Sequence, residues 1–309
     1  MAGAEPERTA AIARPGMLDT ALMGVGVVAV STSGPIMAAM VAPALAIAFW
    51  RNALGAAVTM PWVLLRRRDE LARLDPRQWR LELVAGALLA AHFGTWVPSL
   101  TMTSVASATA LVCLQPVWTA FIARTRGFAV RPRAWVGIAV AVAGAVALTG
   151  VDLSLDRTAL TGDLLALLGG VFAAAYVTVG EEVRRSVSTV TYTTACYATA
   201  ATLLLLACLL GGQPLGGYDA RTWWLLGAIT LGAQLLGHSI FNLILRTVSS
   251  TMVSVVLLLE VPGAALLAAW WLGETPPTLA LPAIAAMLGG LGLVIASPST
   301  GTAAAVPAE

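Results

Sequence analysis

The sequence is short of charge and contains no lysine. Only 11% of its 309 residues are charged, whereas 58% are hydrophobic, and its mean hydropathy is +0.84. A soluble domain carries about 25% charged residues. This chain has too little charge to cover a water-exposed surface, so we expect an integral membrane protein.

Several motifs are also missing, and each absence removes a class of activity. No GxxxxGK[ST] loop is present, which excludes ATP hydrolysis by a P-loop. The sequence has no HExxH and no GxSxG, which argues against zinc and serine proteases. The two histidines are far apart, and we expect no metal and no cofactor. The three cysteines lie in apolar runs without C-x-x-C spacing and are interpreted as small core residues, Cys113, Cys196 and Cys208.

The sequence is rich in apolar segments that are long enough, or nearly long enough, to cross a bilayer. A spanning helix needs about 20 apolar residues. Ten such segments are predicted, over residues 20–40, 45–65, 83–102, 106–122, 134–151, 164–180, 190–210, 223–245, 251–272 and 278–296. The connections are short and leave no room for a soluble domain. We therefore predict an all-α membrane protein of ten transmembrane helices, with residues 1–17 as a disordered tail and 298–309 as a second tail.

The arginines predict how the chain is oriented in the membrane. If the N-terminus is cytoplasmic, all but three of the 18 arginines fall on the cytoplasmic side. Arg157 and Arg221 fall outside, and Arg51 lies in the second span. The positive-inside rule then places both termini in the cytoplasm of a multi-pass protein in the cell membrane. The longest loop, residues 66–80, is expected to be a solvated basic loop, with a short surface helix as the alternative.

An internal repeat is visible at an offset of 145 residues, the difference between positions 260 and 115. The segment 100–118 aligns there with the segment 245–263, and His92 falls within one residue of His238. The aligned pairs include Leu100 with Leu245, Ser104 with Ser249, Leu114 with Leu259, and Gln115 with Glu260.

The repeat predicts two halves of five helices each, residues 18–151 and 159–297. An odd number of spans reverses orientation, so the halves are expected to be inverted repeats about a two-fold axis in the membrane plane. Many secondary transporters have this architecture, with the substrate site near the midplane between the halves.

Glu260 is the leading candidate for function. It is the lone carboxylate in the middle of the apolar stretch 248–274. A charge at mid-helix costs roughly 2.5–3.5 kcal/mol, and protonating an ordinary glutamate at pH 7 costs about 3.7 kcal/mol. The two costs are comparable, so the side chain could carry a proton or bind a cationic group. A structural acid, hydrogen-bonded within the bundle, is the alternative.

Three more candidates lie in the second and third spans. Arg51 could snorkel to the interface, hold a substrate carboxylate in a cavity, or pair with Glu260, and a purely structural pairing is the alternative. His92 and Trp96 lie one helical turn apart and so share a face. They could stack on or hydrogen-bond a small substrate, whereas packing or an interfacial position is the alternative for Trp96.

A stripe of polar side chains marks the eighth span. Gln234, His238 and Asn242 repeat every four residues and therefore share one face. Such a stripe is unfavourable against lipid and should face the interior of the bundle. Substrate binding and helix–helix hydrogen bonding are both open for these three residues.

The remaining candidates are single residues. Ser33 lies in a polar run, residues 31–35, that predicts a bent or locally unwound first span lining the cavity. Gln115 is the neutral counterpart of Glu260, and Tyr176 is a further candidate in the sixth span. Eight glycines are expected to allow close helix packing rather than to bind ligand, namely Gly24, Gly26, Gly144, Gly169, Gly170, Gly289, Gly290 and Gly292.

Three segments resemble a known family. They are FWRNALG (49–55), TSVASATALVCLQPVWTAFIAR (103–124) and SSTMVSVVLLLEVPGAALLAAWWLGE (249–274). With the ten spans, the inverted repeats and the basic loop after the second span, they are similar to the EamA family of the drug/metabolite transporter superfamily. The resemblance covers about residues 18 to 298 and implies a central cavity and a transport activity, mostly export.

This sequence departs from the family pattern in two places. The family usually places glutamate directly before proline, but here Val261 separates Glu260 from Pro262. In addition, Ala129 of the first half stands where the second half has Glu274. For this reason only the central cavity is carried over, and no residue roles.

The sequence therefore predicts a secondary transporter that exports a small organic metabolite, such as an amino acid or a drug, by alternating access that is either coupled to protons or facilitative. Its expected partners are a small-molecule substrate and the lipid bilayer, with no nucleic acid, and a homodimer is left open. An uptake permease or exchanger is the first alternative. A membrane enzyme or assembly protein without transport is the second, but the polar groups lie at mid-span rather than clustered at one interface, so no enzyme is expected.

Overall fold

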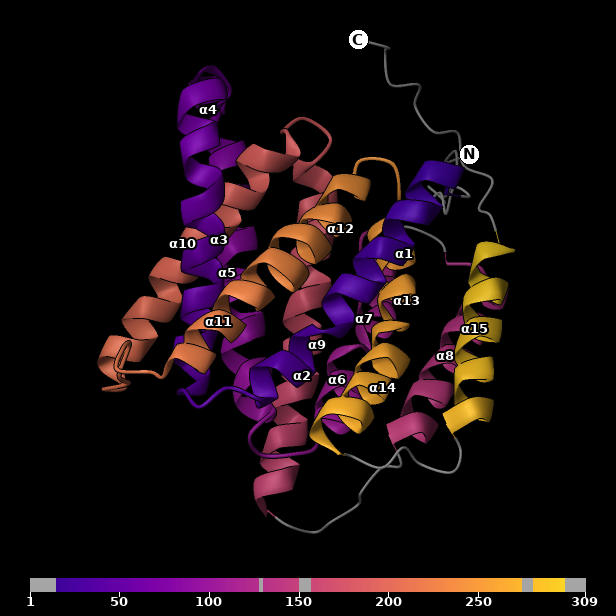
Figure 1. Cartoon of the computed structure of the whole chain (residues 1–309). Coiled ribbons are helices and arrows are strands. Elements are labelled where there is room, and N and C mark those ends of the chain that lie inside the picture. The colour runs from indigo at the N-terminus through magenta and orange to yellow at the C-terminus, as the bar shows by residue number, and fades with distance from the viewer. Residues whose placement is uncertain (1–14, 128–129, 150–156, 274–279, 298–309) are drawn as a thin grey trace, which may run out of the picture.

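Helices occupy each of the ten segments that were predicted to span the membrane (Figure 1). The computed structural model describes residues 15–127, 130–149, 157–273 and 280–297. Most of the predicted tails, residues 1–17 and 298–309, lie outside these ranges, as do Ala129 and Glu274. In the described parts all regular secondary structure is helical.

The described residues of the first half form eight helices, because two of its spans are interrupted and one helix lies outside the spans. They are α1 (Met17–Ser31), α2 (Ser33–Ala38), α3 (Ala44–Arg66), α4 (Arg68–Arg73), α5 (Pro76–Ser99), α6 (Val105–Val112), α7 (Gln115–Thr125) and α8 (Pro132–Thr149).

The second half repeats this order with different interruptions. Its helices are α9 (Arg157–Val183), α10 (Thr189–Leu210), α11 (Ala220–Ile229), the π-helix η1 (Thr230–His238), α12 (Ser239–Ile244), α13 (Ser250–Leu257), α14 (Glu260–Leu272) and α15 (Ala280–Ile295).

The helices have the length and hydropathy of membrane spans. Seven helical segments of the described chain are long and apolar enough to cross a bilayer, and the apolar parts of α8 and α15 are shorter. The remaining span, α3, is 23 residues long and carries Arg51 within it. The predicted all-α membrane fold is confirmed.

Two spans begin about two turns earlier than hydropathy predicts. Helix α5 begins at Pro76 rather than residue 83, because the Asp75 side chain accepts a hydrogen bond from the Gln78 backbone N–H and the Gln78 side chain accepts one from the Asp75 backbone N–H. Proline fits the first position of such a helix because its missing N–H has no partner there anyway. Likewise α9 begins at Arg157 rather than residue 164. As a result Glu82 lies inside α5 and not in the preceding loop.

The expectation of a solvated loop over residues 66–80 is wrong in part, because the segment contains the helix α4. The Glu70 carboxylate of α4 accepts hydrogen bonds from the Ser188 backbone N–H (2.6 Å), the Ser188 hydroxyl (2.7 Å) and the Thr191 hydroxyl (3.0 Å). These bonds attach α4 to the first turn of α10.

The interruption of the first span is confirmed. Helix α1 ends at Ser31 and α2 begins at Ser33, with Thr32 between them. The Thr32 hydroxyl donates to the Ala29 carbonyl at 2.7 Å, which competes with the regular backbone bonding of the helix.

The fourth and ninth spans are interrupted at equivalent places. Helix α6 ends and α7 begins at positions that lie 145 residues before the end of α13 and the start of α14. Each span starts with a serine cap, Ser104 or Ser249, that accepts a backbone hydrogen bond three residues on. Pro116 and Pro262 follow the two breaks, and each lacks the N–H needed to continue the bonding of the preceding helix.

The contacts between helices are also related by the internal repeat. Helix α3 packs against its counterpart α10, and α8 against its counterpart α15, as Figure 1 shows at opposite sides of the molecule. The broken spans cross antiparallel, with α6 against α14 and α7 against α13. Helix α5 packs on α9, and equivalently η1 packs on α1. This pairing is what an inverted repeat requires.

Close packing at glycine is confirmed for five of the eight predicted positions. A Cβ atom would lie 2.5 Å from the Gly137 carbonyl oxygen if added to Gly290, and 2.8 Å from the Val112 carbonyl oxygen if added to Gly170. Gly26, Gly144 and Gly169 are also in close contact. The prediction is wrong at three positions, where nothing lies within 4 Å of the added Cβ, namely Gly24, Gly289 and Gly292.

Two neighbouring glycines of α15 provide a test of the α8–α15 contact. Gly290→Ala should destabilise the protein by about 1–3 kcal/mol, because the new methyl group meets the backbone of α8 and overpacks the contact. Gly289→Ala, one residue away, should leave stability unchanged or slightly raised. Thermal unfolding of the purified variants in detergent measures both. Equal stability of the two variants would contradict the close approach of α8 and α15.

Acidification should weaken the attachment of α4. Partial burial raises the pKa of Glu70, but the hydrogen bonds from Ser188 and Thr191 and the charge of Arg67 outweigh it, so the pKa lies below its ordinary value of 4.5. A depressed carboxyl pKa stabilises the folded state above the unfolded pKa, and this contribution is lost as the pH falls through the folded pKa.

The melting temperature of the wild type should therefore fall more than that of Glu70→Gln when the pH is lowered from about 6 to about 3.5. Asp69→Asn is the matched control, because Asp69 is mostly exposed and lies 4.0 Å from its nearest partner, Arg68. It should follow the wild type. A Glu70→Gln protein with the full acid dependence of the wild type would show that these hydrogen bonds contribute nothing.

Candidate functional site

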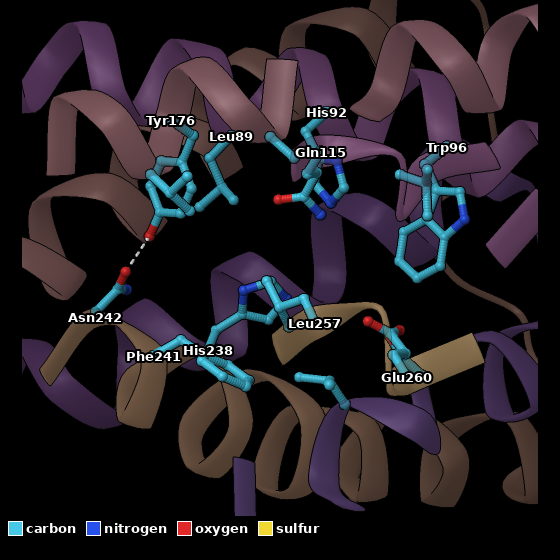
Figure 2. Close-up of a pocket in the computed structure, with 15 residues that line it drawn as sticks. Leu89, His92, Trp96, Gln115, Tyr176, His238, Phe241, Asn242, Leu257 and Glu260 are labelled. Atoms are coloured by element: carbon cyan, nitrogen blue, oxygen red, sulfur yellow. Dashed lines mark hydrogen bonds between the residues drawn. The ribbon is translucent and has the colours of Figure 1, made fainter. Parts of the chain in front are cut away.

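A cavity with mostly apolar walls is lined by residues from both halves (Figure 2). The part of the cavity that the centre of a water molecule can reach has a volume of about 40 Å³. This is room for roughly three or four water molecules. One wall comes from α5, α6, α7 and α9, and the opposite wall from α1, α2, η1, α12, α13 and α14. The lining residues are Val30, Ser33, Leu89, His92, Trp96, Val112, Gln115, Ala173, Tyr176, Val177, His238, Phe241, Asn242, Leu257 and Glu260.

The structure brings eight of the ten predicted site residues together at this cavity. They are Ser33, His92, Trp96, Gln115, Tyr176, His238, Asn242 and Glu260. Arg51 and Gln234 are not among the lining residues and lie behind one wall. Residues up to 227 positions apart in the sequence, the distance from Ser33 to Glu260, thus share one site.

Glu260 lines the cavity even though its spacing to proline departs from the family pattern. It is the first residue of α14, whose N-terminal backbone N–H groups carry a partial positive charge that favours a nearby carboxylate. Its side chain extends toward the opposite wall in Figure 2 and is 7% exposed. The Cys113 thiol is 3.9 Å from one carboxylate oxygen.

Gln115 occupies the equivalent position in the other wall. It is the first residue of α7, as Glu260 is of α14. The two helix N-termini therefore meet the cavity from opposite sides, one with a neutral amide and one with an acid. The repeat detected at an offset of 145 residues is thus a repeat of the site itself.

His92 is held in one tautomer by its packing against α9. Its Nδ1 lies 2.9 Å from the Gly169 carbonyl oxygen, which can only accept a hydrogen bond, so Nδ1 is the donor. In the neutral ring Nε2 is then an acceptor. The ring stacks on Trp96 with centroids 5.6 Å apart. His238 lines the other wall. Its ring packs in a T-shaped arrangement with the Phe93 ring, with centroids 5.5 Å apart.

Three lining side chains have polar atoms without a hydrogen-bond partner among the described residues. They are the Trp96 Nε1, the Gln115 Oε1 and the Asn242 Nδ2. The other end of Asn242 is bound, because its Oδ1 accepts from the Tyr176 hydroxyl at 2.9 Å (Figure 2). A buried polar atom left unpaired costs about 1–3 kcal/mol. Unpaired donors and acceptors in one cavity are the groups that a polar ligand would satisfy.

Arg51 is fully buried in a hydrogen-bond network rather than open to the cavity. Its Nε donates to the Gln234 Oε1 at 2.8 Å and one Nη donates to the Ser33 hydroxyl at 3.1 Å. Gln234 in turn donates to the Asn52 Oδ1 at 3.0 Å. The guanidinium also lies 4.0 Å above the Phe93 ring, a cation–π contact. The direct hydrogen-bond partners of Arg51 are thus Gln234 and Ser33, while Glu260 is close enough to interact with it electrostatically.

The π-helix explains part of this network. A π-helical turn leaves backbone groups out of the regular i to i−4 pattern. The Gln234 carbonyl in η1 accepts a hydrogen bond from the Tyr197 hydroxyl at 3.0 Å. The local change of helix type thus accompanies the contact of η1 with both α3 and α10.

Hydropathy alone does not predict that Glu82 is a buried acid within a span. Glu82 in α5 is 0% exposed, and neither carboxylate oxygen has a hydrogen-bond partner in the part of the chain that the structure describes. The predicted third span began at residue 83, which placed Glu82 in a loop. The Asp75–Pro76 start with Gln78 is the signal that would have included it.

Among the described residues, no group of three or more His, Cys, Asp or Glu side chains lies close enough together to hold a metal ion.

Comparisons with known proteins agree with the fold. The profile of the EamA-like transporter family matches the chain twice, over residues 20–150 and 160–296. No curated protein matches the sequence. Among 29 matching chains of solved structures, one titled "Crystal structure of protein" superimposes with a TM-score of 0.72 at 19% identity, covering 90% of this chain and 96% of its own. At this identity the likeness shows the fold alone.

Substitutions of two glutamines test whether Gln234 stabilises the hydrogen-bond network of Arg51 and whether Gln115 belongs to the cavity alone. Gln234→Leu should destabilise the protein by about 1–3 kcal/mol or more, because it leaves the Arg51 Nε and the Asn52 Oδ1 unpaired. Gln115→Leu is the matched control, and it should leave stability unchanged or raise it because it removes an acceptor that has no partner. Thermal unfolding in detergent decides between them. A larger loss for Gln115→Leu would show that Gln115 is the structural residue.

Proposed function

The chain belongs to the EamA-like transporter family, and on that premise we propose that it exports a small organic metabolite in exchange for protons. Membership makes it a multi-pass membrane protein and a secondary transporter, not an enzyme. The favoured substrates are amino acids and other amphiphilic compounds with an amino group. The two five-helix halves, residues 18–151 and 159–297, act as the units that alternate.

Glu260 carries this proposal. It is the acid of a cavity lined by both inverted halves, and it lies at a helix N-terminus that permits its ionised form. An ionised Glu260 can bind an ammonium group, whereas a protonated Glu260 cannot. Substrate and proton therefore compete for one carboxylate, and this competition couples export of one to entry of the other when the unoccupied, ionised form does not change access.

The rest of the cavity suits a partly apolar substrate. Leu89, Val177 and Leu257 supply apolar surface, while Trp96 and Gln115 supply an unpaired donor and acceptor. Arg51 is engaged by Gln234 and Ser33, which makes it a poor anchor for a substrate anion. These properties favour an amine with an apolar body over a phosphorylated compound.

Access to the cavity must alternate, because its free space holds only a few waters. At one end of the molecule Glu182 of α9 accepts a hydrogen bond from Arg77 of α5 at 2.5 Å and from Arg126 after α7 at 2.7 Å. We take this arginine-rich end as cytoplasmic, with both termini on the same side, by the positive-inside rule. These bonds hold α5, α7 and α9 together at that end, so opening toward the cytoplasm would move this wall as one unit away from the opposite wall.

Transport in proteoliposomes tests the role of Glu260. With a pH gradient imposed, the wild type should move at least one member of a panel of amino acids and amine-bearing amphiphiles. Glu260→Gln should reduce gradient-driven transport by about fivefold or more, the lower range of coupling between two ligands, and should lose its pH dependence. Asp69→Asn, which changes a mostly exposed acid, should behave as the wild type.

Two outcomes would contradict the proposal. Unchanged pH dependence in Glu260→Gln would remove the coupling role of this residue. A wild type that moves no member of the panel, and is not stabilised against heat by any of them, would remove these substrate classes, since a bound ligand raises stability by mass action.

A further inference from the structure

Glu82 is a buried acid that the proposed exchange at Glu260 does not use. It lies in α5, six residues after the start of the helix at Pro76 and ten before His92. At about 1.5 Å per residue it is about 15 Å from His92 along the helix axis, toward the end that carries α4. Ionisable residues inside membrane spans are rare and usually mark pathways for ions or protons.

Glu82 has no compensating charge in the described structure. Neither oxygen has a hydrogen-bond partner, and none of the described ion pairs includes it. In contrast Glu70, Glu181 and Glu182 all accept hydrogen bonds. A carboxylate buried in this way costs several kcal/mol unless it is neutralised. Proton binding is the simplest neutralisation, because no cationic side chain of the described residues is within ion-pair distance.

The groups around Glu82 connect it to the surface on one side. Glu70 of α4 is close enough to interact with it electrostatically. Glu70 lies at the partly exposed attachment of α4 to α10. From α3, which also packs on α5, the only titratable side chains are Arg51 and Arg66. Neither of these arginines forms an ion pair with Glu82 within the described residues.

On the other side, side chains that can carry a proton lead to the cavity. The face of α5 that carries Gly86, one turn beyond Glu82, packs tightly on α10 beside Cys196. Cys196 interacts electrostatically with Glu82, and Tyr192 lies one turn before it on α10. The Tyr192 ring stacks on that of Tyr176 with centroids 6.2 Å apart.

The last group of this series, Tyr176, is at the cavity. Tyr176 lines it and donates its hydroxyl hydrogen to Asn242, as Figure 2 shows. The Tyr192 hydroxyl is buried and has no hydrogen-bond partner among the described residues. Hydroxyl groups that are not fully bonded can accept one proton and release another.

We propose that Glu82 is a second proton-binding site, a relay carboxyl between the cavity and the surface beside Glu70. This inference rests on the proposed proton coupling at Glu260. A proton that leaves the Glu260 carboxyl passes into the cavity and through the tyrosine hydroxyls to the Glu82 carboxylate, forming the neutral acid. The acid then releases the same proton to water beside Glu70 and regains its negative charge. Each step moves one proton, and no electron is transferred.

Two substitutions separate proton binding from packing. Glu82→Gln keeps the size and the polar end of the side chain but cannot bind a proton, and Glu82→Asp retains the acid. Infrared difference spectra of the purified proteins should contain the C=O stretch of a protonated carboxyl group in the wild type that titrates with pH. This band should be absent in Glu82→Gln and shifted in Glu82→Asp. The measurement requires no substrate.

Transport then tests the relay. Glu82→Gln should retain counterflow exchange of substrate, which needs the cavity but no net proton movement. Its gradient-driven transport should fall by about fivefold or more, and Glu82→Asp should recover part of it. An acid with only a packing role would be replaced by glutamine without this separation of the two activities.

Results that contradict the relay can be distinguished from results that contradict the proposed function. Identical carboxyl bands in the wild type and Glu82→Gln would show that Glu82 binds no proton and would overturn the inference. Normal gradient-driven transport by Glu82→Gln, with Glu260→Gln uncoupled, would remove the relay and leave the proposed function intact. A wild type without any proton-coupled transport would remove the proposed function and the relay together. If Glu82→Gln does not fold, a band that fails to shift in Glu82→Asp also overturns the inference.

Discussion

The constraint on which the structure depends is that no backbone polar group can be left facing lipid. Two spans break in mid-membrane, after α6 and after α13, and each break is followed by a proline that cannot complete the helical bonding. Both breaks are therefore enclosed by protein. Gly170 of α9 approaches the Val112 carbonyl at one break, and Gly263 of α14 packs directly on Ser31 beyond the other. The cavity lies where these two enclosed breaks meet, which is why Gln115 and Glu260 line it.

Most of the fold and much of the site could be predicted, because their signals are local. Apolar length predicts the spans, and the 145-residue offset predicts that Gln115 and Glu260 are equivalent. The residues that were not predicted depend on information that apolar length and the repeat do not contain. Glu82 was excluded because hydropathy, and not the Asp75 cap, defined the start of the span. The Arg51–Gln234 hydrogen bond joins residues 183 positions apart, and no periodicity within one helix can indicate it.

The two halves have diverged while retaining one architecture. The first span is interrupted at Thr32, whereas its counterpart α9 is continuous, and the third span is continuous, whereas its counterpart contains η1. From the cap Asp75 to His92 the chain advances 17 residues, and from the cap Asp219 to His238 it advances 19. A π-helical turn holds more residues than an α-helical turn, because its backbone bonds join residues five apart. It keeps His238 in the cavity wall opposite His92 despite the longer path.

The exchange of glutamine for glutamate between the two walls also has an electrical consequence. Two identical neutral walls would let the halves change places without moving charge through the field of the membrane. An ionised Glu260 differs, because alternating access exposes it first to one aqueous phase and then to the other. Carrying a full charge across the membrane is worth about 2.3 kcal/mol per 100 mV, and a partial crossing is worth a proportionate share. A change of access by the empty, deprotonated protein, which is a leak in the exchange cycle, would then depend on voltage, whereas the protonated return moves no charge at Glu260.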